Sequence, residues 1–113
     1  MNNNRATLLD MAQAARDILE FAQGMDYSAL LADRKTQSAL IHQFLILGEA
    51  AKQLSDAFKA GHPEMPWDDM ARMRDKLVHH YREVKIRILW DAIQNDIPKP
   101  LAFLEPFLTR EDA

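Results

Sequence analysis

The chain contains no cysteine and only three glycines among its 113 residues. The lack of cysteine excludes a disulfide framework and a thiolate metal site, and it fits a reducing compartment. The few glycines are far apart, so there is no glycine-rich phosphate loop. No apolar run approaches the length of a membrane span, and the first residues do not resemble a signal peptide. We therefore expect a cytoplasmic protein that does not enter a membrane.

Apolar and charged residues are both plentiful. Hydrophobic residues make up 48% of the sequence and charged residues 27%, a balance typical of a globular rather than a disordered chain. The length suits one domain, which we place over residues 1–113. The net charge of −3 argues against a protein that coats nucleic acid nonspecifically.

Apolar residues recur at helical spacing almost throughout, and no alternating strand pattern is present. Thr7 with Asp10 resembles a capping box, and Gly24 and Gly61 are natural helix stops. Short links between helices favour antiparallel neighbours, so we predict an all-α fold, a four- to five-helix bundle. The predicted helices span about 7–23, 35–59 and 67–81, with one turn after Asp26, a segment around 86–93 and a final helix over 101–108.

Basic residues concentrate in one stretch of this acidic chain. Residues 72–87 hold six basic and two acidic side chains, whereas the rest of the chain has eight basic and fifteen acidic ones. Such an island indicates either a confined anion site or a solvated helix face, and charge alone does not separate the two.

The stretch Met73-Arg-Asp-Lys-Leu-Val-His-His-Tyr81 holds the best candidates for chemistry. On a continuous helix Arg74 and Tyr81 lie about 20° apart, but Arg74 and His79 lie about 140° apart. One straight helix therefore does not bring Arg74 and His79 together. Their convergence needs a distorted helix end or a second copy of the chain.

A metal site or a serine nucleophile is not expected. None of the four histidines forms an i,i+4 metal-binding pair with a helical carboxylate partner, and no serine nucleophile elbow is present. We predict no cofactor and no metal.

The sequence resembles the HepT-like toxins, a branch of the HEPN superfamily of RNases. Arg74-x4-His79-x-Tyr81 matches their RX4HXY motif. The resemblance extends over about residues 7–108 and rests on further segments: Ala32-Asp-Arg-Lys-Thr36 with Ala39, Leu45-Ile-Leu-Gly-Glu-Ala-Ala-Lys-Gln-Leu54, His62-Pro-Glu-Met-Pro-Trp67, Ile88-Leu-Trp90 and Asp96-Ile-Pro98. His80 stands where relatives often have glycine.

The resemblance implies a homodimeric helical bundle that cleaves RNA, such as tRNA, without metal. It implies Arg74 as phosphate clamp and His79 as acid/base, in a cleft shared by two chains. The expected partner is a minimal nucleotidyltransferase antitoxin of the MntA-like kind, which transfers AMP to Tyr81. Arg72, Lys76 and Arg82 are candidates for binding RNA.

Structural roles are the alternatives. Arg74 could pair with a surface acid, His79 could interact with a helix dipole, and Tyr81 could pack its ring. Glu49 stands among apolar residues, where a buried structural hydrogen bond is the expected role. The tryptophans and methionines are predicted core. A further alternative is a non-catalytic helical dimer that serves as the binding module of a nucleotidyltransferase.

Overall fold

The computed structural model describes residues 4–80 and 84–109, and within these ranges the chain is helical without a strand. The helices are α1 (Asn4–Phe21), α2 (Tyr27–Leu31), α3 (Arg34–Gln53), α4 (Asp56–Ala60), α5 (Trp67–His80), α6 (Ile86–Asn95) and α7 (Pro98–Thr109). The predicted all-α bundle is confirmed. Five of these helices span more than two turns, while α2 and α4 are single turns.

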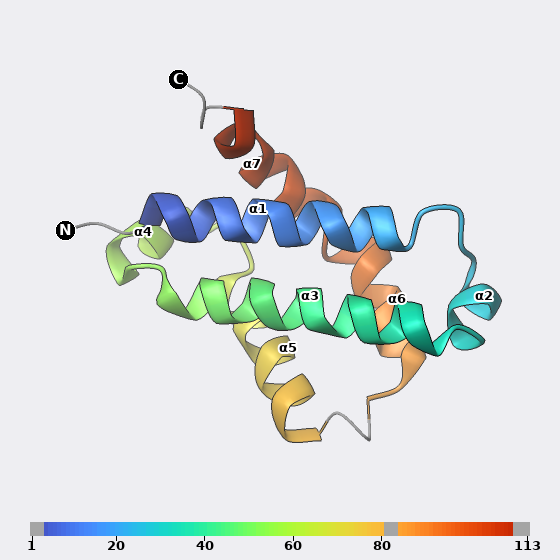
Figure 1. Cartoon of the computed structure of the whole chain (residues 1–113). Coiled ribbons are helices and arrows are strands. Elements are labelled where there is room, and N and C mark those ends of the chain that lie inside the picture. Colours follow the sequence, from blue (N-terminus) through green and yellow to red (C-terminus); the bar gives the residue numbers. More distant parts are fainter. Residues whose placement is uncertain (1–3, 81–83, 110–113) are drawn as a thin grey trace.

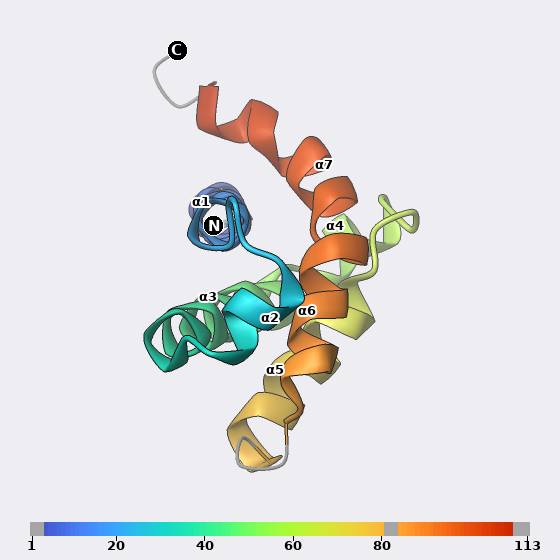
Figure 2. The same ribbon diagram turned by 90° about the vertical axis from the view of Figure 1, so that its right-hand side faces the viewer.

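The long helices α1 and α3 lie side by side and run in opposite directions (Figure 1). Helix α5 also packs against α3, and α7 packs against α1. Figure 2 shows α6 and α7 following one another as a column beside the α1–α3 pair, with α2 next to α6. No helix in residues 4–80 or 84–109 is long and apolar enough to cross a membrane.

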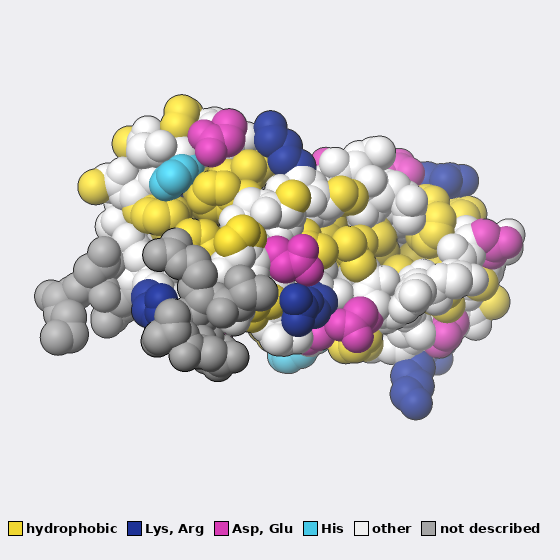
Figure 3. Space-filling view, turned by 90° about the horizontal axis from the view of Figure 1, so that it is seen from above, with side chains coloured by type: hydrophobic (Ala, Val, Ile, Leu, Met, Phe, Trp, Pro, Cys, Tyr) yellow, Lys and Arg dark blue, Asp and Glu magenta, His cyan; other side chains and the backbone are white. Residues whose placement is uncertain are grey.

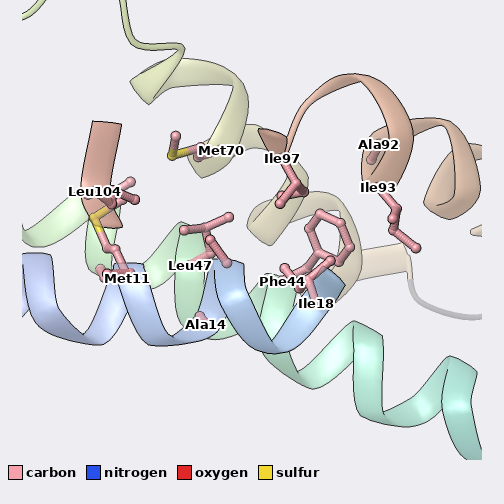
Figure 4. Close-up of a cluster of buried hydrophobic side chains, with 14 of the residues drawn as sticks. Met11, Ala14, Ile18, Phe44, Leu47, Met70, Ala92, Ile93, Ile97 and Leu104 are labelled. Atoms are coloured by element: carbon pink, nitrogen blue, oxygen red, sulfur yellow. The ribbon is translucent and has the colours of Figure 1, made fainter. Parts of the chain in front are cut away.

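The core lies where these helices meet (Figure 4). The apolar stripes that the sequence predicts for α1 and α3 supply much of it. Fully or almost fully buried side chains include Met11 and Ile18 of α1, Phe44 and Leu47 of α3, Met70 of α5, Ile93 of α6 and Leu104 of α7. Trp67 and three methionines are buried, while Trp90, Met25 and Met73 are partly buried, which agrees with the predicted core roles.

The long helix predicted over 35–59 is wrong, because the chain breaks between α3 and α4. Leu54 leaves the helical conformation with ψ 144° while its side chain stays buried. The Ser55 hydroxyl then caps α4 by accepting a hydrogen bond from the Phe58 amide at 3.1 Å. Asn4 fixes this break, since its amide donates to Ser55 Oγ at 3.0 Å and its oxygen accepts from the Ser55 amide at 3.2 Å.

Two predicted helix starts are also wrong. Thr7 does not cap α1 but lies buried inside it, because the helix already includes Asn4. The last helix begins at Pro98 rather than Leu101, since proline lacks only an N–H that a first-turn position does not need. The turn predicted after Asp26 is confirmed as α2, with the Asp26 carboxylate accepting from the Ala29 amide.

The backbones of α3 and α5 come very close at Gly48. A Cβ atom added there would lie 2.3 Å from the Arg74 Cβ and 2.6 Å from the Met70 carbonyl oxygen. Only glycine permits this separation, so Gly48 sets how near α5 approaches α3.

Replacing Gly48 by alanine should therefore destabilise the protein. Higher helix propensity would favour alanine by about 1 kcal/mol, whereas overpacking costs about 1–3 kcal/mol. We expect a lower urea midpoint. Gly61→Ala is the control, because its added Cβ would meet its nearest neighbours at 3.4 and 3.5 Å. An unchanged midpoint for Gly48→Ala would contradict this packing.

Asp96, at the C-terminal end of α6, provides a pH test. Although Asp96 is exposed at the surface, loss of hydration beside the neighbouring chain, and then repulsion from Asp69 and Asp91, raises the pKa of this carboxyl above its usual value. A raised carboxyl pKa means that the folded state prefers the protonated form, so ionised Asp96 destabilises the fold at neutral pH.

Asp96→Asn should accordingly raise the urea midpoint at pH 7, and the gain should disappear as the pH falls below about 4. The exposed Glu20 of α1 supplies a control, Glu20→Gln, which should show no such trend. A gain for Asp96→Asn that persists unchanged at pH 3 would refute the raised pKa of Asp96.

Candidate functional site

Arg74 lies on α5 against α3, where Gly48 leaves room for its stem. Its side chain is about three-quarters buried, with 26% exposed. Nε lies 3.0 Å from the Glu49 carboxylate of α3, and Nη1 lies 3.0 Å from the Asp75 carboxylate. The sequence alternative, in which Arg74 pairs with an acid, is thus realised, and the acid is the Glu49 that the sequence singled out.

Glu49 itself differs from its predicted role. Its side chain is 48% exposed and forms an ion pair, so the expected buried hydrogen bond is wrong. The reason is its place on α3: its neighbours Gly48 and Ala50 face the core, while Glu49 points to the side on which Arg74 emerges.

Asp75 forms ion pairs with two cations, Arg74 and Lys52. Lys52 of α3 lies 2.9 Å from Asp75 Oδ1, the same oxygen that faces Arg74. Hydrogen bonds from Lys52, and then from Arg74, lower the pKa of Asp75. Sequence patterns do not predict this pairing, since Lys52 and Asp75 meet only because α3 and α5 cross here.

Arg74 and Glu49 line an open groove of about 420 Å³ formed by α1, α3 and α5. Apolar side chains form much of its wall: Leu45, Ile46 and Val78, of which Val78 is 43% exposed. His42 and Asp10 also line it. The groove therefore offers one held guanidinium beside an apolar surface.

His79 is exposed near the end of α5, and the structure does not bring it to Arg74. The helix is continuous through both residues, so the separation of about 140° around its axis remains. Tyr81 and Arg82, the predicted AMP acceptor and a predicted RNA-binding residue, lie outside the described residues. The shared site of the sequence prediction is thus not complete within one chain.

Arg72 and Lys76 face another hollow, between α5 and α6. Arg72 pairs with Asp69 at 2.5 Å. Four carboxylates line this hollow of about 660 Å³, from Asp69, Asp75, Asp91 and Asp96. Acids outnumber bases here among the described lining residues, so the basic stretch of the sequence is divided between surfaces rather than gathered on one.

Lys76 also borders a smaller hollow that sequence reasoning missed. Its described lining includes His80, Lys85, Val84 and Ile88, in a volume of about 310 Å³. On the side along α1 and α7, by contrast, acidic and basic side chains are interspersed among hydrophobic ones (Figure 3). Within residues 4–80 and 84–109, no cluster of three or more histidine and acidic side chains could hold a metal ion.

Comparison with known proteins identifies the family. The family model described as "Ribonuclease HepT-like" matches residues 11–107. The protein named "Probable ribonuclease HepT" from Thermococcus cleftensis is 47% identical to this chain. The matched region covers 80% of this chain and 83% of the Thermococcus protein. A candidate RNase of Methanocaldococcus jannaschii is 38% identical over 92% of this chain and 86% of its own length. A candidate RNase of Caldanaerobacter subterraneus is 32% identical over 98% of this chain and 99% of its own length. No solved structure gives a significant match. The chain belongs to the HepT-like ribonuclease family of the HEPN superfamily.

Proposed function

We propose that this protein is a metal-independent ribonuclease, the toxin of a toxin–antitoxin pair whose antitoxin is a nucleotidyltransferase. One observation supports the ribonuclease activity most strongly: Arg74 is held at an open groove, on the helix whose last turn carries the exposed His79. Membership of a ribonuclease family and relatives named as ribonucleases support the same activity.

The side chains suit cleavage by internal transfer. The RNA 2′-oxygen attacks the adjacent phosphorus, the bond to the 5′-oxygen breaks, and a cyclic phosphate and a 5′-hydroxyl result. Imidazole is the side chain that both accepts and donates protons near neutral pH, so His79 can take the 2′-hydroxyl proton or supply one to the leaving 5′-oxygen. Arg74 binds the phosphate and the negative charge that grows on it.

The guanidinium of Arg74 keeps donors for that task. Arginine has five N–H donors. Asp75 accepts a hydrogen bond from one on Nη1, and the Glu49 carboxylate forms an ion pair beside Nε. The other three have no protein partner among the described residues, and they include the pair on Nη2. A phosphate can therefore bind without breaking either ion pair.

We propose a homodimer in which two copies complete the site. The separation of Arg74 and His79 around α5 prevents one chain from placing both on one phosphate. The apolar wall beside Arg74, formed by Leu45, Ile46 and Val78, gives a second copy a surface to cover. RNA is the substrate, with tRNA the first class to test, and Lys76, Arg72 and Arg82 are proposed to contact its backbone.

Regulation rests on Tyr81, two residues after His79. We propose that the nucleotidyltransferase partner transfers AMP to its phenolic oxygen, which attacks the α-phosphorus of ATP as pyrophosphate leaves. The added phosphate and adenosine would compete with RNA for Arg74 and Lys76 and would block its approach.

The second candidate is a helical dimer without nuclease activity that serves as the binding module of the nucleotidyltransferase. The ion pairs of Arg74 favour it, because a purely structural arginine would show them as well. This candidate keeps the dimer and the partner but does not need His79 as a chemical group.

The two candidates differ in what Arg74→Ala and His79→Ala do. In the ribonuclease, each change should lower the rate of tRNA cleavage by about 10²–10⁴. Helicity and melting should change little, since His79 is exposed and the two carboxylates that pair with Arg74 are about half exposed. Incubation of purified protein with total tRNA measures the rates.

The same assay with EDTA tests metal independence, and cleavage should continue. Loss with EDTA and recovery with magnesium would contradict the metal-independent mechanism. Wild-type rates in His79→Ala, or no cleavage by the unmodified protein, would favour the binding module.

Tyr81→Phe should leave cleavage largely intact, because acid/base catalysis and phosphate binding need no phenol. The same variant should resist inactivation by the partner and ATP. Intact-mass spectrometry should show mass gains of AMP units in the wild type and none in the variant. A mass gain that persists in Tyr81→Phe would show that another residue is the acceptor.

A further inference from the structure

Four side chains of alternating charge link α3 and α5. Lys52 lies 2.9 Å from Asp75, Asp75 lies 3.0 Å from Arg74, and Arg74 lies 3.0 Å from Glu49. Two members come from each helix, Glu49 and Lys52 from α3 and Arg74 and Asp75 from α5. We call Lys52, Asp75, Arg74 and Glu49 the ionic ladder.

The ladder depends on the close approach of the two helices. An atom at the Cβ position of residue 48 would lie 2.3 Å from the Arg74 Cβ and 3.2 Å from its Cγ. The stem of Arg74 therefore passes directly over the Gly48 backbone. The next residue of α3 is Glu49, which meets the guanidinium where this stem ends.

From this geometry we propose that Glu49 is a positioning residue, which holds Arg74 through its Nε so that the Nη2 edge is kept for the scissile phosphate. This rests on the proposed ribonuclease function. A guanidinium held on one side loses less rotamer freedom when it binds a phosphate, and misplacement of a reacting group by 1 Å can cost about 10²-fold in rate.

Lys52 has a supporting part. Its ammonium and the Arg74 Nη1 group share a single oxygen of Asp75. Lys52 thereby offsets the charge of Asp75, which would otherwise oppose a phosphate at Arg74. Lys52→Met should leave the full negative charge beside the guanidinium, so RNA should bind more weakly.

The ionic ladder contributes little to the stability of the fold. The side chains of Glu49, Lys52 and Asp75 are each at least 40% exposed, and ion pairs exposed to this degree add little to folding. The structure offers a matched pair elsewhere: Arg16 of α1 and Glu105 of α7 lie 3.3 Å apart, and Glu105 is 48% exposed, as Glu49 is.

The test compares Glu49→Ala, Glu49→Gln and Glu105→Ala in cleavage of total tRNA. Glu49→Ala should be about 10–100-fold slower, because the guanidinium is no longer held. Glu49→Gln keeps the size of the side chain but removes the charge that attracts the guanidinium, so it should be slowed as Glu49→Ala is. Glu105→Ala should match wild type, and all three should melt alike. A Glu49→Gln variant with the wild-type rate would overturn the positioning role, because that role depends on the carboxylate charge.

A double-mutant cycle separates this proposal from the function on which it rests. Glu49→Ala added to Arg74→Ala should cost nothing further, since Glu49 acts only through Arg74. Additive losses would overturn the positioning role. Arg74→Ala with wild-type cleavage would overturn the ribonuclease mechanism, whereas a slow Arg74→Ala with a wild-type Glu49→Ala would overturn only the positioning role.

Nuclear magnetic resonance gives a readout that needs no activity. The ¹H–¹⁵N signal of the Arg74 Nε–H group should be protected from exchange with water in the wild-type protein, where the Glu49 carboxylate lies 3.0 Å from Nε. It should weaken or disappear in Glu49→Ala, and it should persist in Glu105→Ala. An Arg74 signal equally protected in Glu49→Ala would show that Glu49 does not hold the guanidinium.

Discussion

The close packing of α5 on α3 at Gly48 is the constraint on which the candidate site depends. Because no side chain separates the two backbones there, the Arg74 stem crosses α3 and its guanidinium reaches Glu49. The same approach brings Lys52 within 2.9 Å of Asp75. A wider helix separation would leave Arg74 as a mobile surface cation, with full rotamer entropy to lose on binding a phosphate. One residue without a side chain thus determines how its neighbours are placed.

A second constraint comes from the regularity of α5. The helix is unbroken from Trp67 to His80, so Arg74 and His79 point in different directions. This arrangement gives each residue a separate environment: Arg74 is paired and largely buried, while His79 is exposed. For an enzyme that needs both on one phosphate, the missing half of the site has to come from elsewhere. In the proposed dimer a second copy supplies it without distorting the helix, and packs on the apolar wall next to Arg74.

Local signals in the sequence predicted most of the fold. The stripes of α1 and α3, the helical turn after Asp26 and the helix stop near Gly24 depend on nearby residues, and the structure confirms them. The break at Leu54 was missed because its cause is distant: Asn4, fifty-one positions away, binds Ser55. The candidate site was likewise predicted only in part. The motif pointed to Arg74, and the apolar surroundings of Glu49 marked it as unusual, but only the crossing of α3 and α5 shows that the two residues are partners.

Mixing two inactive variants tests the central claim, that each active site takes Arg74 from one chain and His79 from the other. Arg74→Ala and His79→Ala protein would be mixed, exchanged by mild unfolding and refolding, confirmed as dimers by light scattering, and assayed on tRNA. A shared cleft predicts recovery, because each mixed dimer regains one intact site; with random exchange this gives about a quarter of the wild-type rate. No recovery in verified mixed dimers, or a protein that remains monomeric at micromolar concentration, would contradict the shared cleft.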